Sequence, residues 1–189
     1  VEVMLGTLRA GGCIVPLSPM ATSEQLEVMI DDADSRVLFL GNEMRPLAEP
    51  FLRHLSGLLP GGRIAFDFQE DGVQGYADWM SKASDADPGV AIAPGDPFNI
   101  IYSSGTTGIP KGILHDHQIR WGITYRFAGK DFNTSAVSII STPLYSNTTA
   151  VCFYPIFACG GSLVLMKKFD VKGFLELCQS ERVTHAMLV

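Results

Sequence analysis

Short apolar runs alternate along the chain with segments whose apolar residues recur at helical spacing. In the first half, strands are predicted at 37–41 and 63–68, and helices at 24–32 and 47–58. Apolar runs bounded by turn residues are typical of strands buried on both faces, and their alternation with helices indicates a parallel sheet. The first half is therefore predicted to be an α/β unit.

Both ends of the chain lie inside such elements. A helical pattern near the start is closed by Gly11, and a short buried strand is predicted at 13–17. The chain stops at the apolar residues 186–189, which are typical of the middle of a buried strand. Because natural domains rarely begin and end inside core elements, we expect a fragment of a longer protein.

A change of composition near residue 95 divides the chain. Residues 81–96 are rich in Ser, Asp, Pro and Gly, which favour turns and linkers. Beyond them strands are predicted at 98–102, 136–142, 161–167 and 184–189, and helices at 117–127, 148–157 and 171–182. The prediction is an α/β fold of doubly wound, mostly parallel sheets, in two partial lobes at residues 1–95 and 96–189.

Composition narrows the classes of protein to consider. Hydrophobic residues make up 47% of the chain and charged residues 18%, so a large apolar core can form. The net charge of −6 disfavours nucleic acid and anionic lipid as partners, and no apolar run is long enough for an integral membrane segment. The four cysteines lack a C-x-x-C pair and are interpreted as buried thiols. We expect a cytoplasmic protein.

A chemically distinctive segment follows the strand predicted at 98–102. Residues 103–112 are Ser-Ser-Gly-Thr-Thr-Gly-Ile-Pro-Lys-Gly. Glycines let backbone N–H groups converge on an anion, hydroxyls add donors, and Lys111 adds a positive charge. The segment is therefore predicted to bind phosphate. It is not a Walker A motif, because Pro110 precedes the lysine and Gly112 follows it.

This segment, with Tyr102 before it, resembles the signature loop of the adenylate-forming superfamily. That superfamily includes acyl-CoA synthetases, amino-acid adenylation domains and luciferases. Weaker similarities to the same family occur at residues 8–19, 113–118, 142–145, 160–165 and 183–185. On this basis the chain is identified as an internal fragment of the large N-terminal domain of such an enzyme.

The resemblance implies that a carboxylic acid is activated with ATP to an acyl-adenylate, from which the thiol of coenzyme A displaces AMP. Lys111 and Thr107 are the expected catalytic residues, with the Thr107 hydroxyl near Mg²⁺. Donors and cations of this kind neutralise a departing pyrophosphate. The residues expected to bind the phosphates of ATP are Ser103, Ser104, Gly105, Thr106, Thr107, Gly108 and Lys111.

Substrate selection is expected near Tyr145, Ser146 and Asn147. Many family members have an aromatic residue followed by His here, so Ser146 departs from the pattern. Amino-acid adenylation domains place an Asp in this segment to bind the ammonium group. Residues 141–158 contain no Asp, which favours an unsubstituted fatty or aryl acid. The structural alternative is a capped helix start beside a core tyrosine.

Other interpretations remain open at this stage. His115 and His117 form an H-x-H pair, but no third ligand follows at a convincing spacing, so a helix-opening histidine is preferred over a metal site. A non-catalytic phosphate-binding module of the same fold, or a purely structural domain, would also carry these elements. If the chain is a fragment, we expect it to be inactive alone and to self-associate through uncovered edges.

Overall fold

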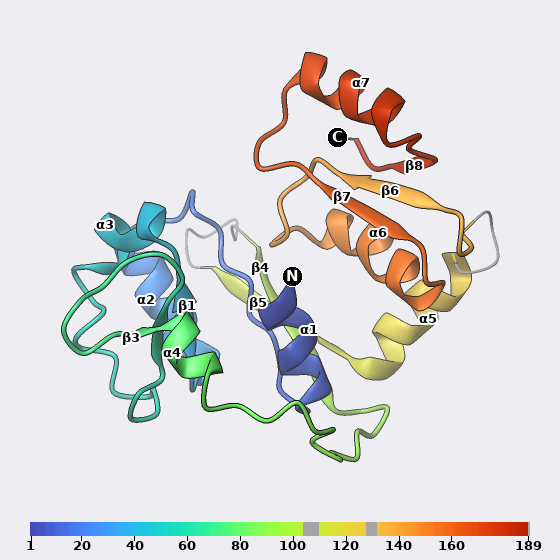
Figure 1. The fold of residues 1–189 in the computed structure, drawn as a ribbon. Coiled ribbons are helices and arrows are strands. Elements are labelled where there is room, and N and C mark those ends of the chain that lie inside the picture. Colours follow the sequence, from blue (N-terminus) through green and yellow to red (C-terminus); the bar gives the residue numbers. More distant parts are fainter. Residues whose placement is uncertain (104–109, 128–131, 189) are drawn as a thin grey trace. The chain divides into compact units, whose positions relative to one another are not determined.

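The computed structural model (Figure 1) describes residues 1–103, 110–127 and 132–188. Contacts within the chain separate two compact units. The first consists of residues 1–91 and 102–113, and the second of residues 92–101 and 114–189. The two lobes predicted at residues 1–95 and 96–189 stay a prediction about domain organisation.

A parallel sheet is the framework of the first unit. Its strands are β1 (Leu38–Leu40), β2 (Arg63–Ala65) and β3 (Gln74–Gly75), paired in parallel in the order β1-β2-β3. The helical elements are α1 (Glu2–Arg9), α2 (Ser23–Asp32), η1 (Asn42–Met44), α3 (Arg45–Ala48) and α4 (Tyr76–Met80). The parallel sheet predicted for this half of the chain is confirmed.

Helix α2 begins where the sequence predicts and supplies much of the first core. The Thr22 side chain accepts a hydrogen bond from the backbone N–H of Gln25 at 3.2 Å, and the Gln25 side chain accepts one from Thr22 at 3.1 Å. This reciprocal pair satisfies N–H groups that have no partner within the helix. The core is formed by Leu26, Met29, Ile30, Leu40, Ala48, Phe51, Leu52, Leu55 and Leu58.

Two predicted elements of this unit are wrong. The helix predicted at 47–58 ends at Ala48, because Pro50 has no N–H to continue the ladder. The turns that follow still bury Phe51 and Leu52. The strand predicted at 13–17 is a single bridge residue, Ile14, since Pro16 interrupts the pairing of an extended segment.

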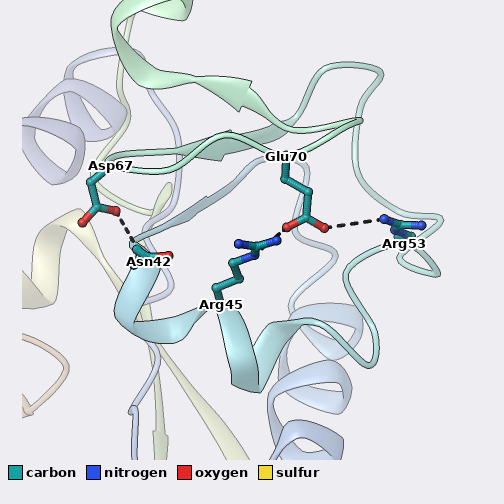
Figure 2. Close-up of polar contacts among 5 residues, drawn as sticks. All are labelled: Asn42, Arg45, Arg53, Asp67 and Glu70. Carbon is teal, nitrogen blue, oxygen red and sulfur yellow. Dashed lines mark hydrogen bonds and ion pairs between the residues drawn. The ribbon is translucent and has the colours of Figure 1, made fainter.

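Acidic side chains beyond β2 connect to the helices that follow β1 (Figure 2). Asp67 accepts a hydrogen bond from the backbone N–H of Asn42 at 2.6 Å. The Glu70 carboxylate lies between two arginines, with Arg45 Nε at 2.9 Å and an Arg53 guanidinium nitrogen at 3.8 Å. The Glu70 side chain is only 13% exposed, so water screens these attractions less than it screens a surface pair.

The second unit is a doubly wound sheet. Its strands are β6 (Val137–Ile140), β7 (Ser162–Leu165) and β8 (His185–Ala186), and its helices are α5 (His117–Phe127), α6 (Asn147–Ala158) and α7 (Val171–Ser180). All strands are parallel, with β6 central in the order β7-β6-β8. The crossovers through α6 and α7 run in opposite directions, so right-handed connections place the helices on opposite faces (Figure 1).

Burial in this unit is concentrated on the central strand and α6. Ser138 and Ile139 of β6 are fully buried, as is Ile156 of α6. Neighbouring buried residues on a strand point to opposite faces, so this strand is covered on both faces. The α/β fold with parallel sheets is thereby confirmed. Within the described residues, none of the helices combines the length and the apolar character needed to cross a bilayer.

Replacing Glu70 with Gln should lower the free energy of unfolding by about 1 kcal/mol, because two cations lose their shared carboxylate. Urea unfolding followed by circular dichroism measures the change. The matched control is Glu176→Gln, which breaks an exposed pair with Lys172 and should change stability by less than about 0.5 kcal/mol. Equal effects of the two substitutions would show that the Glu70 contacts add nothing beyond a surface pair.

Candidate functional site

The predicted phosphate loop connects two neighbouring strands. These are β4 (Pro97–Ser103) and β5 (Lys111–Asp116), which hydrogen-bond to each other as a two-stranded sheet. Parallel neighbours need a connection of about a dozen residues or more, so the short link at 104–110 makes them an antiparallel hairpin. Ser103 is the last residue of β4 and Lys111 the first of β5, and both are exposed.

The hairpin therefore brings two of the predicted phosphate-binding residues to the same end, on either side of the loop. Ser104, Gly105, Thr106, Thr107 and Gly108 lie outside the described residues, so their roles stay predictions. Strand β5 itself was not predicted. Its residues 111–114 are exposed, and Gly112 weakens the strand signal.

Tyr102 fixes the strand that enters the loop. Its hydroxyl donates to Asp32 Oδ2 at 2.6 Å and approaches the Met29 carbonyl oxygen at 3.1 Å, both near the end of α2. The ring packs against the first core. Burial, together with the hydrogen bond to the Asp32 carboxylate and the negative charge of that group, raises the pKa of Tyr102 far above its usual range. The residue next to the loop is thus attached to a helix that packs in the first core, a role that the sequence analysis did not assign.

The strand that leaves the loop is fixed at its other end. Asp116 Oδ1 accepts a hydrogen bond from the Ile119 N–H at 2.7 Å and so caps α5. The backbone N–H groups of His117 and Gln118 donate to the carbonyl oxygens of Asp96 and Pro94 at 3.1 and 2.8 Å. These bonds explain why α5 begins at His117, as the sequence predicts.

The two histidines of the H-x-H pair have different surroundings. His115 lies against Arg120, with 3.3 Å between its Nδ1 and a guanidinium nitrogen. The His117 ring lies edge-on to Phe98, with ring centroids 4.9 Å apart, and its Nε2 is buried without a hydrogen-bond partner among the described residues. Across the part of the chain that the structure describes, no three His, Cys, Asp or Glu side chains are grouped as metal ligands would be.

The predicted substrate segment forms the start of α6. Ser146 is the N-cap, and its hydroxyl accepts a hydrogen bond from the Thr148 N–H at 3.2 Å. This is the structural role that the sequence left as an alternative. Tyr145 is half-buried and Asn147 is exposed, so their contacts with a substrate stay predictions. The neighbouring Thr149 hydroxyl donates to the Pro143 carbonyl at 2.6 Å and stiffens the turn.

A parallel α/β scaffold with a Ser/Thr/Gly loop between paired strands and a lysine at its exit defines the adenylate-forming class of enzymes. The comparison with protein families agrees. The AMP-binding enzyme family matches residues 1–189, and the protein belongs to this family. The resemblance on which the sequence analysis relied is confirmed.

Curated relatives have several acids and acceptors in their names. Fatty acid–[acyl-carrier-protein] ligase ScoC of Streptomyces coeruleorubidus is 24% identical over 194 residues, which cover 100% of this chain and 36% of that protein. 4-Coumarate–CoA ligase 1 of Oryza sativa subsp. japonica is 27% identical over 197 residues, which cover 96% of this chain and 34% of that protein. AMB antimetabolite synthetase AmbB of Pseudomonas aeruginosa is 31% identical over 171 residues, which cover 87% of this chain and 12% of that protein. The chain spans about a third or less of these relatives.

Solved structures share the fold. The ATP-bound MatB from Rhodopseudomonas palustris superimposes with a TM-score of 0.79 at 25% identity, over 97% of this chain and 35% of that one. The inhibitor-bound N-terminal domain of FACL13 from Mycobacterium tuberculosis gives a TM-score of 0.78 at 24% identity, over 97% of this chain and 45% of that one. Both matches show that the chain shares the fold of these proteins over nearly its whole length.

Replacing Tyr102 with Phe should lower the free energy of unfolding by about 2 kcal/mol, because the Asp32 carboxylate loses a charge-assisted hydrogen bond. Urea unfolding at neutral pH measures the loss. Tyr125→Phe is the control, since Tyr125 is 70% exposed and should tolerate the change. An unchanged stability of Tyr102→Phe would contradict the anchoring role.

The stability lost in Tyr102→Phe should depend on pH. The pKa of Tyr102 is raised in the folded state, so its contribution is complete below the unfolded-state pKa of about 10 and is lost as the pH rises above that value. The phenylalanine ring of the variant has no proton to lose. The stability difference between wild type and Tyr102→Phe should therefore shrink above about pH 10, and a constant difference would show that the hydroxyl is not protected from ionisation.

Proposed function

We propose that this chain forms the phosphate-binding part of a ligase that activates a carboxylic acid with ATP and passes the acyl group to coenzyme A. The observation that carries the proposal is the β4–β5 hairpin, whose ends present Ser103 and Lys111 to solvent on either side of a Ser/Thr/Gly loop. The ATP-bound relative and the CoA ligases among the curated relatives support it.

Two steps make up the reaction. A carboxylate oxygen of the acid attacks the α-phosphorus of ATP, the bond from that phosphorus to the bridging oxygen breaks, and pyrophosphate leaves. The thiol of coenzyme A then attacks the acyl carbon, loses its proton, and AMP leaves. The first step concentrates negative charge on the pyrophosphate, so cations and donors that are already in place lower its barrier.

In this proposal the chain supplies those groups from both sides of the loop. The Lys111 ammonium approaches the β- and γ-phosphates from β5, and the Ser103 hydroxyl from β4. Hydroxyls of Ser104, Thr106 and Thr107 add donors, and Gly105 and Gly108 let the backbone approach closely. Mg²⁺ prefers oxygen ligands and would neutralise phosphate charge beside the Thr107 hydroxyl.

The substrate proposed is an unsubstituted fatty or aryl acid. An α-amino acid brings an ammonium group that needs a carboxylate partner when it is buried. Residues 141–158, which include Tyr145 and all of the apolar helix α6, contain neither Asp nor Glu. The relatives support coenzyme A as the acceptor in some cases and a carrier protein in others, so the acceptor is part of the proposal.

Replacing Lys111 with Ala in the full-length enzyme should slow acid-dependent exchange of labelled pyrophosphate by about 100-fold, with little change in the KM of the acid. Lys172→Ala removes an exposed lysine of α7 and is the matched control. Unchanged exchange by Lys111→Ala would refute its phosphate role. ATP binding by wild type without exchange with any acid would instead indicate a non-catalytic nucleotide-binding module.

The substrate class is tested with a panel of acids in the same assay. Fatty and aryl acids should support pyrophosphate exchange, and α-amino acids should not, since no carboxylate in residues 141–158 can pair with the ammonium group. Exchange with an amino acid, but with none of the fatty or aryl acids, would overturn this part of the proposal.

A further inference from the structure

A buried arginine joins the two strands of the hairpin from the second unit. Arg120, on α5, is 2% exposed. Its Nε donates to Asn99 Oδ1 on β4 at 2.6 Å, and one terminal nitrogen lies 3.3 Å from His115 Nδ1 on β5. These residues, Asn99, His115 and Arg120, are called the Arg120 cluster below.

Burying the Arg120 charge in this cluster costs free energy. A guanidinium keeps its charge in proteins, and burial without a carboxylate costs free energy that an apolar side chain would avoid. Within the described residues no carboxylate pairs with Arg120, and its second terminal nitrogen and the Asn99 amide nitrogen are buried without partners. Desolvation lowers the pKa of Arg120. Apolar packing alone therefore does not explain this residue.

The other charged or titratable groups around the guanidinium do not remove this cost. Tyr154 of α6 interacts electrostatically with Arg120, but burial raises the pKa of Tyr154 to about 12, so it is neutral at ordinary pH. Burial and the Arg120 charge lower the pKa of His115. The Asp116 charge acts in the opposite direction, but its effect is smaller. A neutral His115 can accept a hydrogen bond from Arg120, whereas a protonated one cannot.

The cluster lies on the same face of the hairpin as the two residues that flank the loop. Side chains on a strand alternate between faces, so Asn99 and Ser103 share one face of β4, and Lys111 and His115 share one face of β5. Arg120 contacts Asn99 and His115 together, so these side chains are on the same face of the hairpin. Ser103 and Lys111 therefore lie on that face too, at the end next to the loop.

We propose that Arg120 is a positioning residue for the ATP-dependent step, which fixes the pairing of β4 with β5 and thereby the placement of Ser103 relative to Lys111. The inference rests on the proposed function. Arg120 itself touches no phosphate in this account. Its planar guanidinium binds acceptors on two strands at once in a fixed geometry, whereas an apolar residue has no donors and a lysine presents its donors from one freely rotating nitrogen.

The test uses Arg120→Leu in the full-length enzyme. Leucine removes the link but also removes a buried charge, so the midpoint of thermal unfolding should stay within about 5 °C of wild type. The kcat of acid-dependent pyrophosphate exchange should fall about tenfold, because small displacements of catalytic groups are costly, while the KM of the acid stays within about twofold. Arg126→Leu, an exposed arginine of the same helix, is the matched control.

Substitutions of Asn99 separate positioning from folding. Asn99→Asp keeps the acceptor and gives Arg120 a carboxylate, so exchange should stay within about twofold of wild type. Asn99→Leu removes the acceptor and should lower kcat as Arg120→Leu does, which keeps the test available if that variant does not fold. A structural role alone would instead lower stability and leave kcat per folded enzyme unchanged.

The outcomes distinguish the two proposals. If wild type shows no exchange with any acid, the proposed function fails, and the positioning role falls with it. If wild type is active and Arg120→Leu or Asn99→Leu retains its kcat, the positioning role alone is overturned. Loss of activity in Asn99→Asp equal to that in Asn99→Leu would also overturn it, because the acceptor atom is present in one and absent in the other.

Discussion

The pairing of β4 with β5 is the constraint on which the candidate site depends. The loop between these strands consists mainly of glycines and small hydroxyl residues, which have little side-chain surface to pack. Fixing the backbone of glycines costs more conformational entropy than fixing that of other residues. The strands on either side must therefore determine where its ends lie. Ser103 and Lys111 mark those ends.

The hairpin is attached in both units, because each of its strands has residues in the first and in the second. In the first unit, Tyr102 binds the end of α2, a helix whose Met29 and Ile30 belong to the core. In the second unit, Arg120 binds β4 and β5 together. Helix α2 thus both buries apolar side chains and binds Tyr102, so a core mutation in α2 would also disturb the strand that enters the loop.

The two units differ in the partners of their buried charged side chains. Glu70 is shielded from water but has two arginines as partners, an arrangement in which attraction offsets desolvation. Arg120 is more deeply buried and bonds only to neutral groups among the described residues. The first pattern is expected of a contact that stabilises a fold. The second costs stability, and such costs are typical of residues retained for geometry rather than for folding.

The sequence by itself determined the features that depend on neighbours along the chain. These are the alternation of helices and strands, and the Ser/Thr/Gly segment ending at Lys111 that identified the family. It failed where a local signal was weak or interrupted, as in the exposed strand β5 and the helix that stops before Pro50. Only the tertiary structure revealed that Tyr102 reaches Asp32 and that Arg120 reaches Asn99, because each bond joins residues far apart in the chain, and neither residue type specifies its partner.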